Sequence, residues 1–238
     1  MKNKIFLLCA IIVVCVFYGF SSHRYENRTL KKVNVRFSGS SEPLISYTNV
    51  NKLLIQSGDS TEMLFLEKLA LHQSETRLVD DAMIRTAEVS LSLDGNLEAI
   101  VEQRRPIARI MKGQGQYLDD DNKLMPLSKE HTVRVPLIYG FRTEFQDDIF
   151  ELITSLKADS LLEKSFTDVR IDVQRGFVLA PRAYEYEVVL GEIDNHQIKL
   201  EKYKAFVAKM AKDNKLEELK TVDLRYRKQV ITTKKQAL

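Results

Sequence analysis

Few side chains in this 238-residue sequence have the types and spacing that catalysis or metal binding requires. No two histidines form a His-Glu-x-x-His pair, and both cysteines, Cys9 and Cys15, lie in an apolar run near the N-terminus. Metal sites need several such ligands at characteristic spacings. We therefore expect no metal and no other cofactor. Surface or partly satisfied roles are expected for the four histidines, which are His23, His72, His131 and His196.

Three further motifs could serve catalysis or ligand binding, but each lacks a residue that its chemistry needs. Gly113-Gln114-Gly115 lacks the third glycine, or the Gly-Lys-Ser/Thr, of a phosphate-binding loop. The acidic run 119–121 has Leu124 where a calcium loop needs its turn glycine, so a solvated hairpin tip is predicted there. No serine lies in a Gly-x-Ser-x-Gly elbow. The sequence therefore predicts a protein that is not an enzyme and takes no small-molecule substrate.

The overall charge gives no indication of a nucleic-acid partner. The 36 basic and 33 acidic residues give a net charge of only +3. Nucleic-acid binding proteins usually concentrate basic residues far beyond this balance. With 44% hydrophobic and 29% charged residues, the chain has the composition of a globular protein with a buried core.

An uncharged run at residues 5–20 is preceded by Lys2 and Lys4. A sixteen-residue helix is about 24 Å long, against roughly 30 Å of bilayer hydrocarbon, and Ser21 and Ser22 can extend it. The run is longer than the apolar part of most signal peptides, although Gly19 and Ser21 would suit a cleavage site. We predict a retained transmembrane helix at 5–22 after a cytoplasmic tail at 1–4. Lysine and arginine counts on its two sides leave the orientation open.

Hydrophobic periodicity predicts an α+β fold in two domains, of which the first covers residues 23–104. Alternating and helical patterns predict the order strand, helix, helix, strand, strand. The expected elements are a strand at 32–37, helices at 48–56 and 74–85, and a hairpin of strands at 87–93 and 97–101. In the second helix, Leu78 and Ala82 are expected to face inward.

The second domain, residues 105–238, is expected to be mostly antiparallel β structure with packed helices. Its expected strands lie at 107–111, 116–118, 123–127, 133–137, 169–173, 177–180, 184–188, 219–226 and 229–233. An apolar stripe predicts a helix at 145–156, whose start has the Thr143 and Gln146 spacing of a capping box. A second helix with Leu200 and Tyr203 facing inward is expected to begin near Asn195.

Several segments of the chain occur in an order that is typical of one protein family. The hairpin at 87–101 leads into the junction 104–109, which contains Arg-x-Pro-type sequence. A Tyr-Leu-Asp hairpin follows at 117–128, with Asn122 where a glycine is common, and a Val-Asp-Leu-Arg-Tyr segment stands at 222–226. In their order and spacing, these segments resemble the FtsQ/DivIB family of bacterial cell-division proteins.

The resemblance implies a non-catalytic scaffold of the divisome. It implies a single-pass inner-membrane protein with a cytoplasmic N-terminus and a periplasmic C-terminus at the septum. The first domain would be of the POTRA type, and the second would bind FtsB and FtsL and so regulate septal peptidoglycan synthesis. The alternative is a POTRA-bearing protein of an outer-membrane or secretion assembly pathway.

The last predicted strand, at 229–233, is expected to have a neighbour on one side at most. Open strand edges can recruit a strand from another chain. In the family that the chain resembles, partner binding lies around these near-terminal strands. The residues expected to line the FtsB-binding edge are Arg225, Tyr226, Val230 and Ile231, with Tyr226 as the aromatic anchor. The alternative is that Lys234 and Lys235 only protect the edge from aggregation.

The membrane topology can be tested with protease. If residues 5–20 remain in the mature protein, the body of the chain from about Ser22 onward is periplasmic and should be degraded when protease is added to spheroplasts. Recovery of a soluble form that begins near Ser22 would contradict this expectation, because it would identify the run as a cleaved signal.

Overall fold

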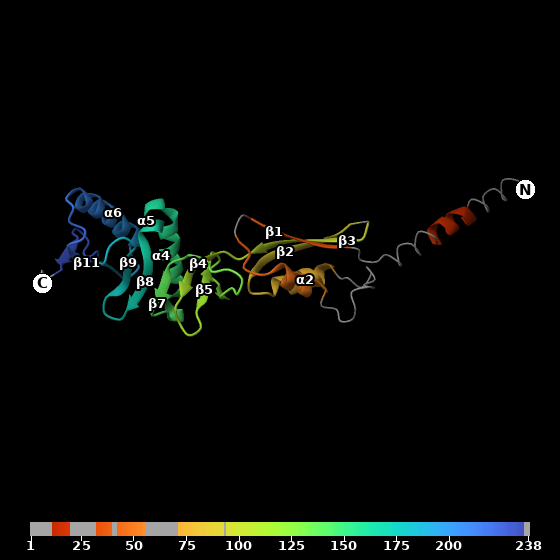
Figure 1. Ribbon diagram of the computed structural model, residues 1–238, viewed down its shortest axis with the longest axis horizontal. Coiled ribbons are helices and arrows are strands. Elements are labelled where there is room, and N and C mark those ends of the chain that lie inside the picture. Colours follow the sequence, from red (N-terminus) through yellow and green to blue (C-terminus); the bar gives the residue numbers. More distant parts are fainter. Residues whose placement is uncertain (1–10, 20–31, 40–41, 56–70, 93, 236–238) are drawn as a thin grey trace, which may run out of the picture. The chain divides into compact units, whose positions relative to one another are not determined.

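A computed structural model describes residues 11–19, 32–39, 42–55, 71–92 and 94–235 (Figure 1). It has the predicted α+β class, with helices and two sheets. The contacts divide it into two units, Met1–Gln103 with Lys129–His131 and Arg104–Ser128 with Thr132–Leu238. Residues 11–19 are helical, and no helix within the described ranges is long and apolar enough to cross a bilayer. The predicted membrane helix at 5–22 lies partly outside the described residues.

The N-terminal unit packs two helices on a three-stranded sheet. Its elements are β1 (Lys32–Ser38), α2 (Tyr47–Ile55), α3 (Leu71–Val79), β2 (Ile84–Leu91) and β3 (Asn96–Gln103). Among the described residues this is the predicted order. β3 lies in the middle, parallel to β1 and antiparallel to β2. Alternate β3 side chains, Leu97, Ala99 and Val101, are fully buried in one cluster with Leu54 and Leu78 of the helices.

The second helix of this unit is shorter at its C-terminal end than predicted. α3 ends at Val79, and the Asp81 carboxylate accepts a hydrogen bond from the Met83 N–H at 2.9 Å, which turns the chain into β2. Leu78 is buried as predicted, whereas Ala82 is exposed because it falls in this turn.

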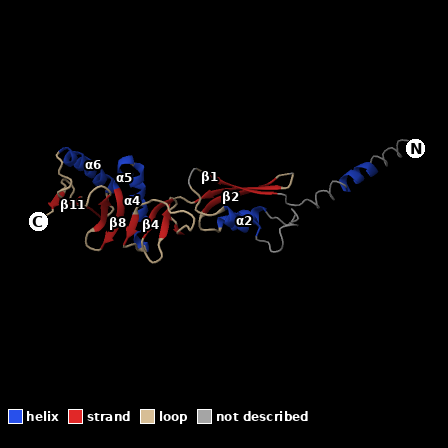
Figure 2. Ribbon diagram, viewed as in Figure 1, coloured by secondary structure: helices blue, strands red, loops and turns tan. Residues whose placement is uncertain are grey.

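A nine-stranded sheet forms the C-terminal unit (Figure 2). Its strands are β4 (Pro106–Ile110), β5 (Gln116–Asp119), β6 (Leu124–Pro126), β7 (Leu137–Tyr139), β8 (Phe166–Asp172), β9 (Gly176–Pro181), β10 (Glu187–Gly191), β11 (Leu219–Asp223) and β12 (Ile231–Lys234). Their spatial order is β12-β11-β10-β9-β8-β7-β4-β5-β6. Most pairings are antiparallel as expected, but β4–β7, β7–β8 and β10–β11 are parallel. Two of these parallel pairs follow from helical crossovers, which return the chain in its original direction.

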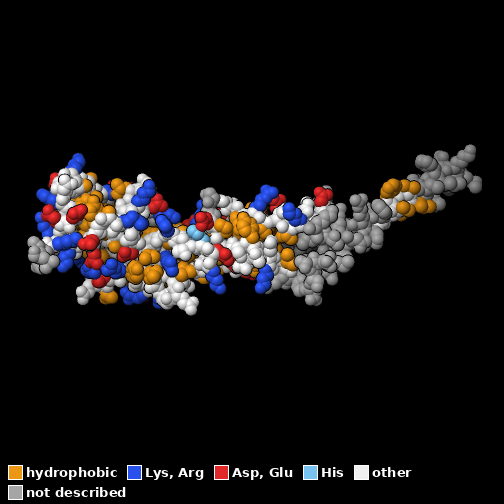
Figure 3. All heavy atoms as spheres, viewed as in Figure 1, with side chains coloured by type: hydrophobic (Ala, Val, Ile, Leu, Met, Phe, Trp, Pro, Cys, Tyr) orange, Lys and Arg blue, Asp and Glu red, His pale blue; other side chains and the backbone are white. Residues whose placement is uncertain are grey.

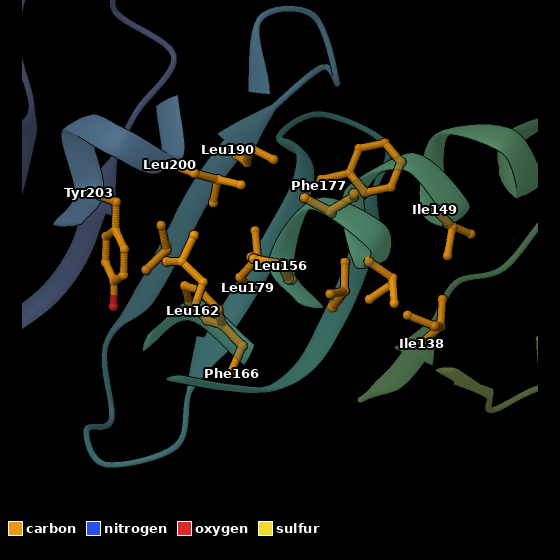
Figure 4. Packing of buried hydrophobic residues seen from close by; sticks show 14 of the residues in the cluster. Ile138, Ile149, Leu156, Leu162, Phe166, Phe177, Leu179, Leu190, Leu200 and Tyr203 are labelled. Atoms are coloured by element: carbon orange, nitrogen blue, oxygen red, sulfur yellow. The ribbon is translucent and has the colours of Figure 1, made fainter. Parts of the chain in front are cut away.

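Three helices make those crossovers and pack on the sheet. They are α4 (Gln146–Ala158) and α5 (Ser160–Ser165) between β7 and β8, and α6 (His196–Lys212) between β10 and β11. Side chains from the three helices meet alternate strand residues in one buried cluster, as Figure 4 shows for Leu156, Leu162 and Leu200 against Leu179 and Leu190. α5 was not predicted from the sequence. It begins where the Asp159 carboxylate accepts hydrogen bonds from the N–H groups of Leu161 and Leu162.

The predicted capping box at Thr143 and the predicted strand at 133–137 are both wrong. In each case a hydrogen bond to a residue distant in sequence takes the place of the local one. The Gln146 amide donates to the Asn122 carbonyl at 2.8 Å, so no capping box forms and a 3-10 turn, Thr143–Phe145, precedes α4. The strand expected at 133–137 is observed only at Leu137–Tyr139. The Val133 N–H donates to the Tyr117 hydroxyl instead, and Pro136 has no N–H for a ladder.

The acidic hairpin 119–121 is the predicted solvated tip only in part, because Asp121 is exposed and Asp120 half-buried while Asp119 is not. Asp119 is fully buried, and its carboxylate accepts hydrogen bonds from the N–H groups of Asp121 and Lys123. The Arg104 guanidinium pairs with the same carboxylate at 3.1 Å. The φ of Asn122 is +59°, which agrees with its expected role in place of glycine.

Gly176 permits a close backbone contact between the β8–β9 turn and the end of β10. Its φ is +72°, and a Cβ there would lie 2.5 Å from the Gly191 carbonyl carbon and oxygen. Gly113 has a similar φ of +59°, but a Cβ there would meet no described atom within 4 Å.

We expect Gly176→Ala to destabilise the chain much more than Gly113→Ala. The positive φ alone costs about 1 kcal/mol in both variants, while the backbone clash at Gly176 should raise the loss to at least about 3 kcal/mol. Urea unfolding followed by circular dichroism measures both free energies. Equal losses in the two variants would show that the contact between Gly176 and Gly191 is not tight.

Candidate partner-binding edge

β12 is the last strand of the nine-stranded sheet and pairs antiparallel with β11. No other strand within the described ranges lies on its far side, and all four of its residues are exposed. An edge of this kind presents backbone donors and acceptors to solvent, where another chain can pair with them.

The register of the neighbouring strands shows which backbone groups of β12 face outward. The Leu224 N–H donates to the Val189 carbonyl of β10 at 2.9 Å, so Leu224 and, by alternation, Val222 direct their backbone groups toward β10. Asp223 and Thr221 therefore direct theirs toward β12, where their partners are Ile231 and Thr233. The N–H and C=O of Thr232 point to the open side.

The four residues predicted to bind a partner lie close together in sequence, but only Ile231 is in a strand. β11 ends at Asp223 and β12 begins at Ile231, so the predicted strands 219–226 and 229–233 extend too far into the loop between them. Ile231 is 38% exposed and Tyr226, in the loop, is 46% exposed. Val230 is half-buried and packs against the core cluster. Arg225 is exposed at the start of the loop.

A lysine of α6 holds this loop in place. The Lys202 ammonium donates hydrogen bonds to the carbonyl oxygens of Leu224, at 3.2 Å, and Tyr226, at 2.7 Å. Partial burial lowers the pKa of Lys202, and the nearby Lys199 lowers it further. These bonds fix the backbone of Tyr226 while its ring stays accessible. Sequence reasoning did not find Lys202, because the contact depends on how α6 packs on the sheet.

Arg225 is fixed by Asp223 and by a glycine on β10. The Arg225 guanidinium makes two short contacts with the Asp223 carboxylate, Nε–Oδ1 at 3.0 Å and Nη2–Oδ2 at 2.7 Å. Its methylenes lie against Gly191, where an added Cβ would be 2.7 Å from the Arg225 Cγ. Burial by itself raises the pKa of Asp223, but hydrogen bonds from the Arg225 side chain and backbone N–H outweigh it and hold the pKa below its ordinary value.

Next to Arg225 is a groove of about 490 Å³ between the β8–β9 turn, the end of β10 and the start of α4. It carries both signs of charge, with basic Arg142, Arg175 and Arg225 and acidic Asp148, Asp172 and Asp194. Acidic and basic side chains are likewise interspersed over the face of the C-terminal unit in Figure 3. Such a surface favours a partner with matched polar groups over a uniformly charged polymer.

Lys234 and Lys235 lie at the end of β12 and both form ion pairs within the unit. Lys234 pairs with Glu218 at 2.8 Å, and Lys235 pairs with Glu185 at 2.9 Å. Both pairs lie at one end of the strand, away from Ile231 and Tyr226. A protective role for these lysines is therefore compatible with partner binding at the other end.

Ser155 and His196 have the residue types of a catalytic pair, but their contact joins two helices that pack together. The Ser155 hydroxyl of α4 lies 2.8 Å from His196 Nε2 of α6, and His196 Nδ1 lies 3.0 Å from the Ile193 carbonyl oxygen. His196 is 4% exposed, so both ring nitrogens are satisfied inside the helix interface. In the described part of the chain no three His, Cys, Asp or Glu side chains converge as a metal site would require.

Comparison with known proteins relates the unit that carries this edge to a family. A family model described as FtsQ/DivIB, C-terminal related, matches residues 105–233, which is more than half of the chain. The chain belongs to the FtsQ/DivIB C-terminal related family. A search of curated proteins found no match.

The family match agrees in part with the resemblance seen in the sequence. It covers the nine-stranded unit as far as Thr233 in β12, and it is to a family related to the FtsQ/DivIB C-terminal domain rather than to the core family. The relationship links the chain to cell division and to a group of generally non-catalytic proteins of the cell envelope.

The contribution of the Arg225–Asp223 pair to the stability of this FtsQ/DivIB-related unit should depend on pH. We expect Arg225→Met to raise the pKa of Asp223, because burial of the carboxyl remains while the guanidinium is lost. A carboxyl whose folded pKa lies below its unfolded pKa stabilises the fold above the unfolded value, and this contribution is lost as pH falls through the folded pKa.

The substitution should therefore destabilise the chain more at pH 7 than below the folded pKa of Asp223. Carbon-13 NMR titration of the Asp223 carboxyl, with urea unfolding at both pH values, measures the two effects. A titration midpoint that does not move would contradict the assigned pairing.

Proposed function

We propose that this protein is a non-catalytic membrane-anchored scaffold of the bacterial division machinery, which binds FtsB and FtsL through the open edge of β12. The observation that carries the proposal is that β12 is the terminal strand of its sheet. This sheet lies in the part of the chain that matches the FtsQ/DivIB C-terminal related family. Through these partners the scaffold would link early and late division proteins and regulate septal peptidoglycan synthesis.

Strand addition is the binding mode that this edge favours. A partner strand beside β12 would pair with the outward N–H and C=O of Thr232, and those backbone bonds would provide affinity. The side chains of Ile231 and Tyr226 would provide specificity, because both are large, accessible and next to the edge. The groove beside Arg225 lies close enough to receive residues that precede or follow such a strand.

We further propose that this scaffold is anchored in a membrane and projects from it. We assign residues 1–4 as a cytoplasmic tail, 5–22 as a single-pass helix of the inner membrane, 23–104 as a POTRA-type domain and 105–238 as the partner-binding domain. The order β1-α2-α3-β2-β3 among the described residues supports the POTRA assignment. In this proposed topology β12 would lie in the periplasm, where a septal partner could reach it.

Edge binding predicts a specific effect of proline at position 232. Thr232→Pro removes the outward N–H but leaves the hydrogen bonds between β11 and β12, so the full chain should lose co-purification of FtsB while remaining folded. Thr232→Ala keeps the N–H and should bind normally. Tyr226→Ala, which removes the aromatic anchor, should also abolish co-purification. Val230→Pro should do the same, although Val230 also packs on the core.

Circular dichroism and urea unfolding of each variant separate lost binding from lost folding. Normal FtsB co-purification with both Thr232→Pro and Tyr226→Ala would place the interface elsewhere. Loss of binding in Thr232→Ala as well would show that the side chain, rather than the backbone edge, is recognised.

A further inference from the structure

A second hollow of the C-terminal unit lies away from β12, on the face of the sheet that the helices cover. Its volume is about 270 Å³, and it opens between segment 133–136, the start of β4, and helices α4 and α5. Fully buried apolar side chains form its floor, namely Ile107, Ile153, Leu156, Leu162 and Phe166. Phe166 belongs to β8, so β9, β10 and β11 separate this hollow from β12 in the sheet.

The rim of this apolar hollow carries unneutralised positive charge. Arg134, Lys157 and Arg182 are exposed rim residues, and none of the three pairs with a carboxylate of the described residues. The Arg182 guanidinium donates instead to the backbone carbonyls of Lys164 and Phe166. Glu163 is the acidic residue of the rim. The rim therefore has an excess of two positive charges around an apolar floor.

We propose that this hollow is a second docking site, which binds an acidic peptide segment of a partner protein by inserting one or two of its large apolar side chains. The volume lies below the roughly 300–1,000 Å³ of sites that enclose a small molecule, and it suits a side-chain anchor instead. Carboxylates that flank the anchor would meet the rim cations, which complement them in charge. Segment 133–136, which is neither helix nor strand, borders the hollow and supplies a wall along which a peptide can lie.

This site is independent of the edge proposed to bind FtsB. It lies beside β4 and β8 rather than β12, and it uses none of the residues Arg225, Tyr226, Val230 and Ile231. A scaffold with both sites could hold two partners at once, because neither would cover the other's residues.

Selection from a phage-displayed library of random dodecapeptides on the purified full chain tests the proposal. Selected peptides should carry Asp or Glu beside Leu, Ile or Phe. Their affinity, measured by fluorescence polarisation, should fall at least about tenfold in Arg134→Glu/Lys157→Glu, which reverses the rim charge. It should fall similarly in Val135→Trp, which fills the hollow from its wall and leaves every charge in place.

The control is Lys209→Glu/Lys212→Glu, which makes the same change of charge on exposed residues of α6 and should leave binding unchanged. Urea unfolding verifies that each variant is folded. Peptides without acidic and apolar residues, or peptides that bind all variants equally, would overturn the proposal. A loss of dihexanoyl phosphatidylglycerol binding in the two pocket variants, with no pocket-dependent peptide selected, would also overturn it in favour of a lipid.

Discussion

A strand can satisfy its backbone N–H and C=O groups only through neighbours, and β12 has a described neighbour on one side alone. The parallel pairing of β10 with β11 determines which backbone N–H and C=O groups of β11 point toward β12. The register of β11 with β12 then determines which backbone groups of β12 have no partner strand. The pairing of β10 with β11 is in turn produced by the α6 crossover. The unpaired groups of Thr232 are therefore a consequence of the topology of the whole unit, and the proposed function depends on them.

The rest of the unit holds this edge and its loop in one geometry. Burial of α4, α5 and α6 on one face fixes the sheet, and the same helix α6 supplies the Lys202 ammonium that binds the loop carbonyls. Gly191 lets Arg225 lie flat against β10, where Asp223 pairs with it. A preorganised edge loses little conformational entropy when a partner strand is added, which favours affinity from backbone bonds alone. Because the surface carries charges of both signs, a partner would be recognised by charges and polar groups that match it locally.

Periodicity in the sequence was sufficient to predict the α+β class, the hairpin of β2 and β3 and the buried stripe of α4 that contains Leu152 and Leu156. Such patterns indicate which face of an element is buried, and each pattern lies within one short stretch of sequence. The sequence failed where one distant partner decides the outcome, as for Gln146 with Asn122 and for Asp119 with Arg104. The outward direction of the Thr232 N–H and C=O depends on the register of β10, β11 and β12 together. The sequence around Thr232 therefore contains no pattern that predicts it. The four partner-binding residues remain a prediction, as does the membrane helix.

Amide hydrogen exchange at Thr232, measured by NMR on the full chain with and without the periplasmic segment of FtsB, tests the account most directly. In the free chain the Thr232 amide should exchange fast, while the neighbouring Thr233 amide, paired with β11, should be protected. Strand addition predicts that FtsB protects Thr232 strongly and changes Thr233 little. A complex that forms while Thr232 continues to exchange at its free rate would contradict the account, because the edge would then not be where FtsB binds.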